Sequence, residues 1–341
     1  MSFLRLHSKN IGIDLGTASI LVVLEGKGIC INEPAIVAVR QKQQTVLAIG
    51  HEAKEMIGRT PNEIRPLSPL QHAGISDLKA AEMIVKNVIK RLERTEEIGM
   101  PKIVINVHVG MTEVEKRAVL KLIYDVGARE AYLVEEPIAA ALGANLDVYS
   151  PEGTMVVDIG AGMTEVAVMA LGKIVSSDAL RIAGDDLDQN IMDYIKKNLK
   201  VEIGKNAAER IKIEIASAKP RVNQKITIKG RDLRRGLPRE ITIDAFQVYE
   251  AIRGSLFKMV DVIKGTLDRT PPELIMNVQR AGITLTGGTA YIDGLDKLIS
   301  ERLRIKVNVP ENPLECVALG IGKVIESSEK MKELKSKKKV K

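Results

Sequence analysis

Apolar positions along the chain alternate between short runs typical of strands and longer stretches with helical spacing. Short apolar runs at 20–24 and 166–171 each follow a glycine-containing turn, and residues 103–107 form another strand candidate. Over 79–92 the apolar residues recur at helical spacing. Strands that alternate with helices in this way predict an α/β layered fold.

Capping signals set the ends of the predicted helices. Thr112 and Glu115 form a capping-box pattern that begins a helix running to about Val126, and Gly127 stops it. Asp244 is expected to cap a long helix that reaches Leu267. The other elements predicted in the second half are helices over 187–199, 207–218 and about 314–327, with hairpin strands over 224–228 and 240–243.

One strand–turn–strand pattern occurs twice, about 144 residues apart. It reads IDLGTAS over 13–19 and VDIGAGMT over 157–164, and a strand over 283–286 runs into a third glycine turn. Glycines at such turns let backbone N–H groups approach an anion, and a preceding Asp suits hydrated Mg²⁺. The repeat predicts a nucleotide clamped between two related halves, whereas ordinary hairpin turns are the alternative. The chain has no G-x-x-x-x-G-K-[ST] loop, which excludes a P-loop protein.

Two acidic residues precede Pro137, which can open a helix. A carboxylate there lies at the positive end of the helix dipole and is expected to stay ionised. Facing a γ-phosphate, it would orient a water for in-line attack. We predict this role for Glu136 and a structural role for Glu135. The alternative is that Glu136 serves only as a helix cap.

Glu209 and Lys212 are spaced i, i+3 and share one helix face. They would hold a ribose hydroxyl and flank a base. From spacing alone, a surface ion pair accounts for them almost as well.

Composition describes an ordinary globular protein. The 341 residues suffice for a sizeable core and two domains, with 45% hydrophobic and 28% charged residues. Trp is absent and Phe is rare, so aromatic platforms for single-stranded nucleic acid are not evident and no nucleic-acid partner is expected. Cys30 and Cys316 make no metal or disulfide framework. No secretory signal or 18-residue apolar stretch is visible, which predicts a cytoplasmic protein.

The positive charge is concentrated at the end of the chain. Residues 330–341 hold seven Lys and one Glu, a net +6, so the other 329 residues carry about +1 of the total +7. A basic tail on a nearly neutral body predicts an electrostatic tether to an anionic membrane, worth about 1 kcal/mol per charge near the surface. A solvated end without a partner is the alternative.

Together these segments resemble MreB, the bacterial actin family that shapes rod cells, within the actin, DnaK-type chaperone and sugar-kinase superfamily. The resemblance covers about residues 8–327, and the absent Trp and Lys-rich composition fit a source among wall-less spiral bacteria. It implies an actin-like fold of two domains around an ATP cleft, with domain I over 1–144 and domain II over 145–315. The matching segments are 14–18, 32–34, 112–118, 135–137, 285–288 and 316–320. The implied subdivisions are a large subdomain over 1–31 and 76–144, small subdomains over about 32–75 and 181–244, a return to domain I over 316–329, and a tail over 330–341.

The resemblance also implies Mg-ATP binding, with the hydrated Mg²⁺ held by Asp14 and Asp158. Glu136 matches the family's water-orienting glutamate, and Glu209 and Lys212, with residues 287–290, would border the adenosine. The full cofactor-binding set is Thr17, Ala18, Ser19, Gly160, Ala161, Gly162, Gly184, Asp185, Glu209, Lys212, Gly287, Gly288, Thr289 and Ala290.

The second turn departs from the family pattern Asp-Ile-Gly-Gly-Gly-Thr-Thr-Glu. Ala161 replaces a Gly, and Met163 replaces the first Thr, whose hydroxyl is expected to help position the attacking water and relay its proton. Met has no donor, and losing a positioned proton-transfer group costs about 10²–10⁴-fold in rate. Thr164 is not expected to substitute, because alternate strand residues point to opposite faces. We therefore predict weak ATP hydrolysis.

Partners follow from the same resemblance. It implies a homopolymer of paired protofilaments, paralogous filament proteins as further partners, and contact with the inner face of the cell membrane. Residues 98–100 lie where the family carries an apolar membrane loop, although ordinary packing explains them equally well. The alternative function is a small-molecule kinase of the same superfamily, but no second specific pocket is legible in the sequence.

Overall fold

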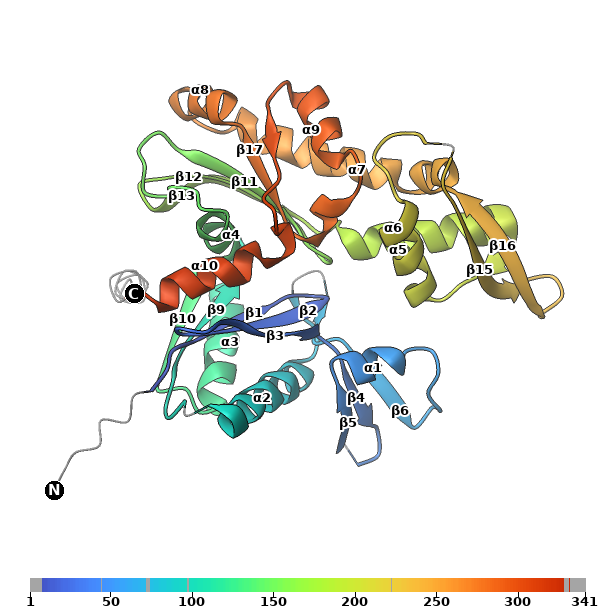
Figure 1. Cartoon of the computed structure of the whole chain (residues 1–341), viewed down its shortest axis with the longest axis horizontal. Helices are drawn as coiled ribbons and strands as arrows, with labels where there is room; N and C mark the ends of the chain where they lie inside the picture. The colour runs from blue at the N-terminus through green and yellow to red at the C-terminus, as the bar shows by residue number, and fades with distance from the viewer. Residues whose placement is uncertain are drawn as a thin grey trace. The chain divides into compact units, whose positions relative to one another are not determined.

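The computed structural model describes residues 8–43, 45–71, 74–96, 98–221, 223–327 and 331. These residues form two compact units, seen in Figure 1. Unit 1 comprises the described residues up to Val148 and from Glu315 onward, and unit 2 is Tyr149–Leu314. Most of the basic tail over 330–341 lies outside the described residues, so its predicted role stays a prediction.

Unit 1 is built on a five-stranded sheet in the order β10-β9-β1-β2-β3. Strands β1 (Ile11–Leu15), β2 (Ser19–Leu24) and β3 (Gly28–Pro34) form an antiparallel meander. Strands β9 (Lys102–Val107) and β10 (Glu130–Glu135) then add in parallel beside β1. The carboxyl ends of β1, β9 and β10 therefore meet at one edge, where ligands of open α/β sheets usually bind.

Helices cover both faces of this sheet. Figure 1 shows α4 (Glu136–Gly143) and α10 (Cys316–Ile325) over one face, with α2 (Leu78–Thr95) and α3 (Glu113–Asp125) over the other. The buried apolar side chains of α2 and α3 join those of the strands in one core. The C-terminal helix α10 thus completes unit 1 after the chain has passed through unit 2.

A smaller group of elements extends unit 1 beyond β3. Its three-stranded sheet has the order β5-β4-β6, and a two-stranded ribbon follows it. The elements are β4 (Val37–Arg40), β5 (Thr45–Ile49), α1 (His51–Glu55), β6 (Ile64–Leu67), β7 (Leu70–Gln71) and β8 (Gly74–Ile75).

Unit 2 repeats the topology of the main sheet of unit 1. Strands β11 (Thr154–Ile159), β12 (Thr164–Ala170) and β13 (Lys173–Leu180) form the antiparallel meander. Strands β17 (Ile283–Thr286) and β18 (Val307–Asn308) add in parallel beside β11. The two sheets share one order and one set of strand directions, which confirms the predicted related halves and the α/β class.

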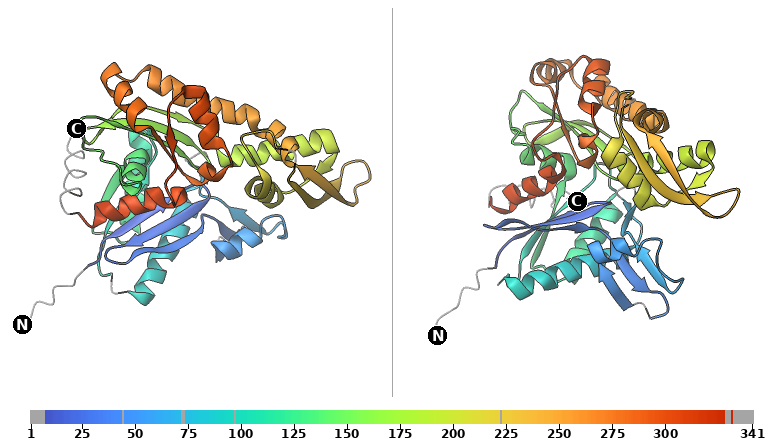
Figure 2. Two further views of the ribbon diagram at one scale, coloured as in Figure 1. Left: turned by 45° about the horizontal axis from the view of Figure 1, so that its top comes forward. Right: turned by 45° about the vertical axis from the view of Figure 1, so that its right-hand side comes forward.

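The remaining elements of unit 2 include a second, three-stranded sheet in the order β14-β15-β16. Helices α5 and α6 pack on each other and on α7. Figure 2 shows the chain in two further views. The elements are α5 (Gly184–Tyr194), a π-helical turn Ile195–Leu199, β14 (Val201–Glu202), α6 (Lys205–Ile215), β15 (Lys225–Asp232), β16 (Pro238–Asp244), α7 (Ala245–Asp268), α8 (Pro272–Ala281), a 3₁₀ turn Gly288–Tyr291, α9 (Leu295–Leu303) and a 3₁₀ turn Pro313–Glu315.

The predicted caps are confirmed. The Thr112 hydroxyl accepts from the N–H of Glu115, whose carboxylate accepts from the N–H of Thr112 at 2.8 Å. Asp244 caps α7 in the same way, its carboxylate accepting the N–H of Gln247 at 2.8 Å. Local hydrogen bonding alone explains these boundaries, so the sequence could reveal them.

Two predicted helices end earlier than expected. The helix predicted over 207–218 stops at Ile215, because Ala216 is extended and the Ser217 hydroxyl donates to the Asp293 carboxylate at 2.8 Å. The helix predicted over 187–199 is α-helical only to Tyr194 and continues as the π-helical turn, which Lys200 closes in a left-handed conformation. In both cases a contact or conformation beyond the helix overrides the apolar periodicity.

The candidate membrane loop is divided between core and surface. Ile98 is buried and packs in the core of unit 1, whereas Met100 is 64% exposed. Among the described residues, no helix is long and apolar enough to cross a bilayer.

Candidate functional site

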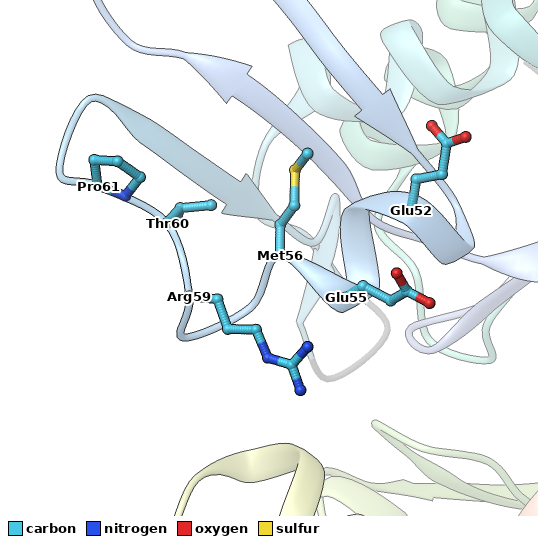
Figure 3. Close-up of a pocket in the computed structure, with 6 residues that line it drawn as sticks. All are labelled: Glu52, Glu55, Met56, Arg59, Thr60 and Pro61. Carbon is cyan, nitrogen blue, oxygen red and sulfur yellow. The ribbon is translucent and has the colours of Figure 1, made fainter.

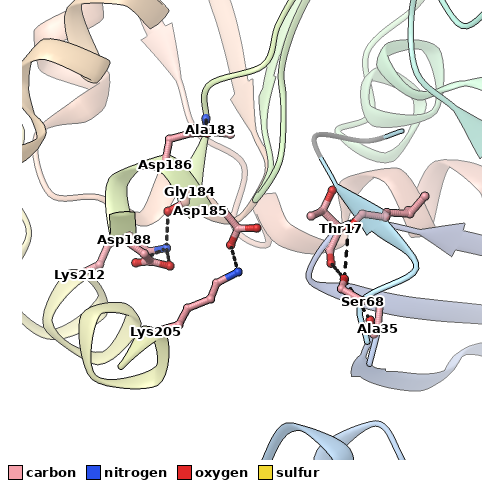
Figure 4. A network of polar contacts seen from close by, with 11 residues as sticks. Thr17, Ala35, Ser68, Ala183, Gly184, Asp185, Asp186, Asp188, Lys205 and Lys212 are labelled. Carbon is pink, nitrogen blue, oxygen red and sulfur yellow. Dashed lines mark hydrogen bonds and ion pairs between the residues drawn. The ribbon is translucent and has the colours of Figure 1, made fainter. Parts of the chain in front are cut away.

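The first glycine turn joins β1 to β2 in unit 1. The N–H of Gly16 donates to the carbonyl of Ser19 at 2.9 Å, which closes the turn. Two further carbonyls of the turn are also held. The Ser68 hydroxyl donates to that of Thr17 at 3.2 Å (Figure 4), and the N–H of Ala35 donates to that of Ala18 at 2.9 Å. The turn therefore has a fixed shape, and these bonds satisfy carbonyl oxygens that would otherwise repel an anion.

Carboxylates lie at the ends of two strands of the same sheet. Asp14 is 8% exposed near the end of β1, and Glu136 opens α4 directly after β10, with Pro137 next to it. The predicted helix start at the Glu-Pro pair is therefore confirmed. Glu135 takes the N-cap position of α4, and its side chain makes no cap hydrogen bond.

A buried amide that the sequence analysis did not single out lies between these groups. Asn106, near the end of β9, accepts a hydrogen bond from the N–H of Leu15 at Oδ1, at 3.0 Å. Its Nδ2 donates to Glu136 Oε2 at 3.1 Å. The only signal in the sequence is a polar residue in the otherwise apolar run 103–107.

The second glycine turn joins β11 to β12 in unit 2 and is held by three neighbours. The carbonyl of Gly160 accepts the N–H of Gly184 at 3.2 Å and the hydroxyl of Thr289 at 2.7 Å. The carbonyl of Ala161 accepts the N–H of Asp185 at 2.7 Å. Unit 2 thus gathers the turn, the start of α5 and the 3₁₀ turn after β17, which are three of the segments predicted to bind nucleotide.

Lys212 joins this cluster from α6. Its ammonium donates to the carbonyl of Gly184 at 2.9 Å, and a Cβ at position 184 would lie 3.3 Å from it and 3.1 Å from the Thr289 hydroxyl. Gly184 therefore permits a close approach that a larger residue would crowd. Asp185 pairs with Lys205 at 3.0 Å on the same side (Figure 4). Lys212 pairs with Asp188 at 2.9 Å and 16% of its side chain is exposed, so it is not a fully solvated surface lysine.

Asp188 is the second functional candidate that sequence reasoning missed. The Lys212 ammonium lies 2.9 Å from both of its carboxylate oxygens and donates to Oδ2, whereas the buried Oδ1 accepts no hydrogen bond within the described part of the chain. Burial raises the pKa of Asp188 to about 6, and Lys212 opposes that rise. The sequence signal for Asp188 is an acidic residue on the buried face of α5, between Leu187 and Ile191.

Asp158 lies buried beside Thr286 in unit 2. The Thr286 hydroxyl donates to its Oδ2 at 2.8 Å, and burial raises the pKa of Asp158 to about 6. Gly287 adopts φ +83°, and a Cβ there would lie 2.4 Å from the carbonyl of Ile159 and 2.9 Å from Asp158 Oδ1. Glycine at 287 is therefore required by both backbone conformation and space.

The donor set fits a hydrated Mg²⁺ better than a protein-enclosed metal. Among the described residues, no three His, Cys, Asp or Glu side chains gather as a metal site. Asp14 and Asp158 instead each lie just ahead of a glycine turn in their own unit. Magnesium keeps several waters and commonly binds through one or two carboxylates with phosphate oxygens, so these residues suit an ion that arrives with a nucleotide.

The residue expected to relay a proton is apolar, and its neighbour is engaged elsewhere. Met163 is 7% exposed at the end of the second turn. Thr164 is fully buried, and its hydroxyl donates to the carbonyl of Ile182 at 2.8 Å. The Thr164 hydroxyl is thus committed to a structural bond within unit 2.

The remaining predicted residues take positions on the same segments. Thr289 and Ala290 are buried in the 3₁₀ turn that Gly288 begins, and Glu209 is half-buried on α6, one turn before Lys212. Gly162 lies within the second turn, Ser19 is the first residue of β2, and Ala18 is exposed. In unit 1 a separate hollow of about 480 Å³ lies beside α1 and the loop that follows it (Figure 3). It is lined by Glu52, Glu55, Met56, Arg59, Thr60 and Pro61, and none of the predicted site residues borders it.

Comparison with known proteins places these features in a family. A family model described as MreB/Mbl protein matches residues 8–333. The chain is 41% identical to the cell shape-determining protein Mbl of Bacillus subtilis (strain 168), covering 97% of this chain and 99% of that protein. It is 42% identical to the cell shape-determining protein MreB of Escherichia coli (strain K12), covering 95% of each. Among solved structures it is similar to MreB5 of Spiroplasma citri bound to ADP, with a TM-score of 0.91 and 32% identity over 96% of this chain and 99% of that one.

Proposed function

The chain belongs to the MreB/Mbl family, and from this premise we propose that it is an ATP-binding, actin-like cytoskeletal protein that polymerises into filaments governing cell shape. The observation that carries the proposal is the cluster in unit 2, where Gly160, Gly184, Lys212 and Thr289 meet within hydrogen-bonding distance. Segments far apart in the sequence converge there on a glycine turn. Such a turn suits phosphate, and we assign the half-buried Lys212 beside it to the nucleoside.

Nucleotide binding is supported by both the fold and the relatives. The Spiroplasma citri MreB5 structures carry ADP in one case and AMPPNP in the other. In this chain we assign phosphate contacts to the turns at 16–19 and 160–162 and the nucleoside to Glu209, Lys212 and 287–290. Asp14 and Asp158 would hold Mg²⁺, which would neutralise phosphate charge.

We assign the orientation of the attacking water to Glu136. The carboxylate stands at the start of α4, where the helix dipole favours its charged form. Met163 supplies no proton relay, and the Thr164 hydroxyl is bonded to Ile182. Turnover is therefore proposed to be weak, so that ATP occupancy rather than rapid hydrolysis controls assembly.

Self-association into paired protofilaments is the proposed working state. A solved structure described as a MamK double helical filament has a TM-score of 0.78 to this chain, but its 22% identity supports the shared fold alone. Paralogous filament proteins are proposed as further partners. The matches to cell shape-determining proteins give no support to the kinase alternative.

Peripheral binding at the inner face of the cell membrane is a separate part of the proposal. The exposed Met100 and the lysines of 330–341 would supply apolar and electrostatic contact. Sedimentation with anionic liposomes, for the full chain and for a chain ending at 329, tests it. Equal pelleting of both forms would show that the tail does not contribute to membrane binding.

ATP-dependent pelleting of the purified protein tests the main proposal. Wild-type protein should pellet with Mg-ATP and stay in solution without nucleotide. Lys212→Ala should weaken ATP binding at least tenfold, because the half-buried ammonium is lost. Lys219→Ala is the matched control, since Lys219 forms a surface pair with Glu301 in the same unit. If neither the wild type nor the control binds a purine triphosphate in calorimetry, the proposal fails.

A further inference from the structure

We propose that Asn106 is a positioning residue that ties the water-orienting carboxylate of Glu136 to the first phosphate-binding turn. The inference rests on the proposed function, because it assigns the bridge a role in ATP cleavage. Its geometry stands independently: one buried amide bonds the backbone N–H of Leu15 and the side chain of Glu136.

The topology of unit 1 places Asn106 between the two groups. Strand β9 is the middle one of three parallel strands, with β1 on one side and β10 on the other. In register, Ile105 pairs with Ile13, and Asn106 pairs with Val134. The turn after β1 and the helix after β10 therefore both begin within two residues of the position of Asn106. A side chain on the middle strand is the one that can reach both.

Burial makes the two hydrogen bonds necessary. Asn106 is 7% exposed, and its neighbours Ile105 and Val107 are 1% and 4% exposed. A buried amide without partners is destabilising, so an Asn in this apolar strand requires bonds at both ends. Hydrophobic packing alone would favour Val or Ile at this position.

The direction of each bond is fixed by chemistry. The N–H of Leu15 can only donate, so the acceptor Oδ1 must face it. The Nδ2 group then faces Glu136, whose carboxylate accepts. A bond to an ionised acceptor is stronger than a neutral one, and this bond selects one orientation of the Glu136 side chain. The carboxylate is thereby held at a set place relative to the backbone that leads into Gly16.

This linkage would matter most for cleavage and least for affinity. Displacement of a catalytic group by about 1 Å can cost 10²-fold in rate. Binding of ATP depends mainly on the turns and on the nucleoside contacts, which Asn106 does not form. Loss of the bridge is therefore expected to reduce the cleavage rate while the ATP dissociation constant changes little.

The test exchanges the amide and the carboxylate. Asn106→Asp keeps an acceptor for the N–H of Leu15 but sets two carboxylates against each other. Glu136→Gln removes the carboxylate, and the double variant Asn106→Asp/Glu136→Gln restores one hydrogen bond with its direction reversed. Asn32→Asp is the matched control, because Asn32 is exposed on β3 of the same sheet.

Two readouts are made on the full chain: the urea midpoint without nucleotide, and single-turnover cleavage of ATP. Asn106→Asp should lower the midpoint and slow cleavage about 10- to 100-fold, with ATP affinity within about threefold of wild type. The double variant should recover the midpoint but not the cleavage. Asn32→Asp should change neither.

The outcomes separate the bridge from the proposed function. If the stability losses of the two single variants simply add in the double variant, the bridge does not exist in solution and the inference is wrong. If Asn106→Asp lowers the midpoint but cleaves ATP at the wild-type rate, the residue is structural only. If wild-type protein cleaves no ATP, the hydrolytic part of the proposed function fails, and the positioning role fails with it even where the midpoints confirm the bridge.

Discussion

Helices α4 and α10 approach each other through a reciprocal pair of glycines. A Cβ at Gly143 of α4 would lie 1.8 Å from the carbonyl oxygen of Cys316, and one at Gly320 of α10 would lie 1.8 Å from that of Ala139. Ordinary van der Waals contacts of a Cβ begin at 3.4 Å. Gly320→Ala would therefore need the two helix backbones to separate locally by about 1.6 Å.

Two opposing effects decide the sign of this substitution. Replacing Gly by Ala inside a helix gains about 1 kcal/mol from backbone entropy and propensity. Overpacking a core costs about 1–3 kcal/mol, and here the obstacle is a backbone carbonyl rather than a flexible side chain. Ala139 and Ile321 nearby are fully buried, so the site has no free space. We expect the upper end of the cost and a net loss of about 2 kcal/mol in the free energy of unfolding.

The same substitution should affect chemistry, because α4 begins at Glu136. Pushing α10 away from α4 would displace the amino end of α4 with it. We expect Gly320→Ala to slow single-turnover ATP cleavage about tenfold or more, since about 1 Å of misplacement is costly for a catalytic group. Retained ATP affinity would separate this effect from general unfolding.

Urea denaturation followed by far-UV circular dichroism measures the stability change. The control is Gly254→Ala in α7, where a Cβ would meet nothing within 4 Å, so it should be stabilising by about 0.5–1 kcal/mol. Because the two units need not unfold together, hydrogen exchange in residues 136–143 should localise the loss to unit 1. If Gly320→Ala is as stable as the Gly254 control, the argument from close helix approach is wrong.

Three further substitutions test the site. Asp188→Asn should remove a pH dependence of the free energy of unfolding. The pKa of Asp188 is raised from 3.8 to about 6, so ionisation of this carboxyl in the wild type lowers the free energy of unfolding as pH rises from about 4 to 6. The loss amounts to up to about 3 kcal/mol. Thermal unfolding from pH 4 to 7 should show the wild type losing stability relative to this variant, and parallel curves would contradict the assignment. Thr286→Val should lower unfolding free energy by about 1–3 kcal/mol by removing the bond to Asp158, whereas Thr286→Ser should keep most of it in urea titrations. Met163→Thr should raise phosphate release about 10²–10⁴-fold in a coupled assay, and no gain would refute the missing proton relay.

Features with local causes were predictable from the sequence. The repeated strand–turn–strand segments, the caps at Thr112 and Asp244 and the helix start at Glu136 all follow from residues within a few positions of each other. The doubling of the motif also predicted the two sheets of shared topology. The early end of α6 was not predictable, because it depends on Asp293, 76 residues away from Ser217.

Asn106 and Asp188 show why part of the site could not be read from sequence. Each is one polar residue in an apolar pattern, and such a residue is as compatible with an exposed edge as with a buried bond. Its meaning depends on which segment folds against it: Leu15 and Glu136 meet Asn106, and Lys212 meets Asp188. Once such a residue is buried it must be hydrogen-bonded, because an unpaired polar group in the core destabilises the fold more than an apolar side chain would. We therefore expect substitutions of such residues to show which distant segments depend on each other. The positions concerned are single polar residues at the carboxyl end of a parallel strand or on the buried face of a helix at the site.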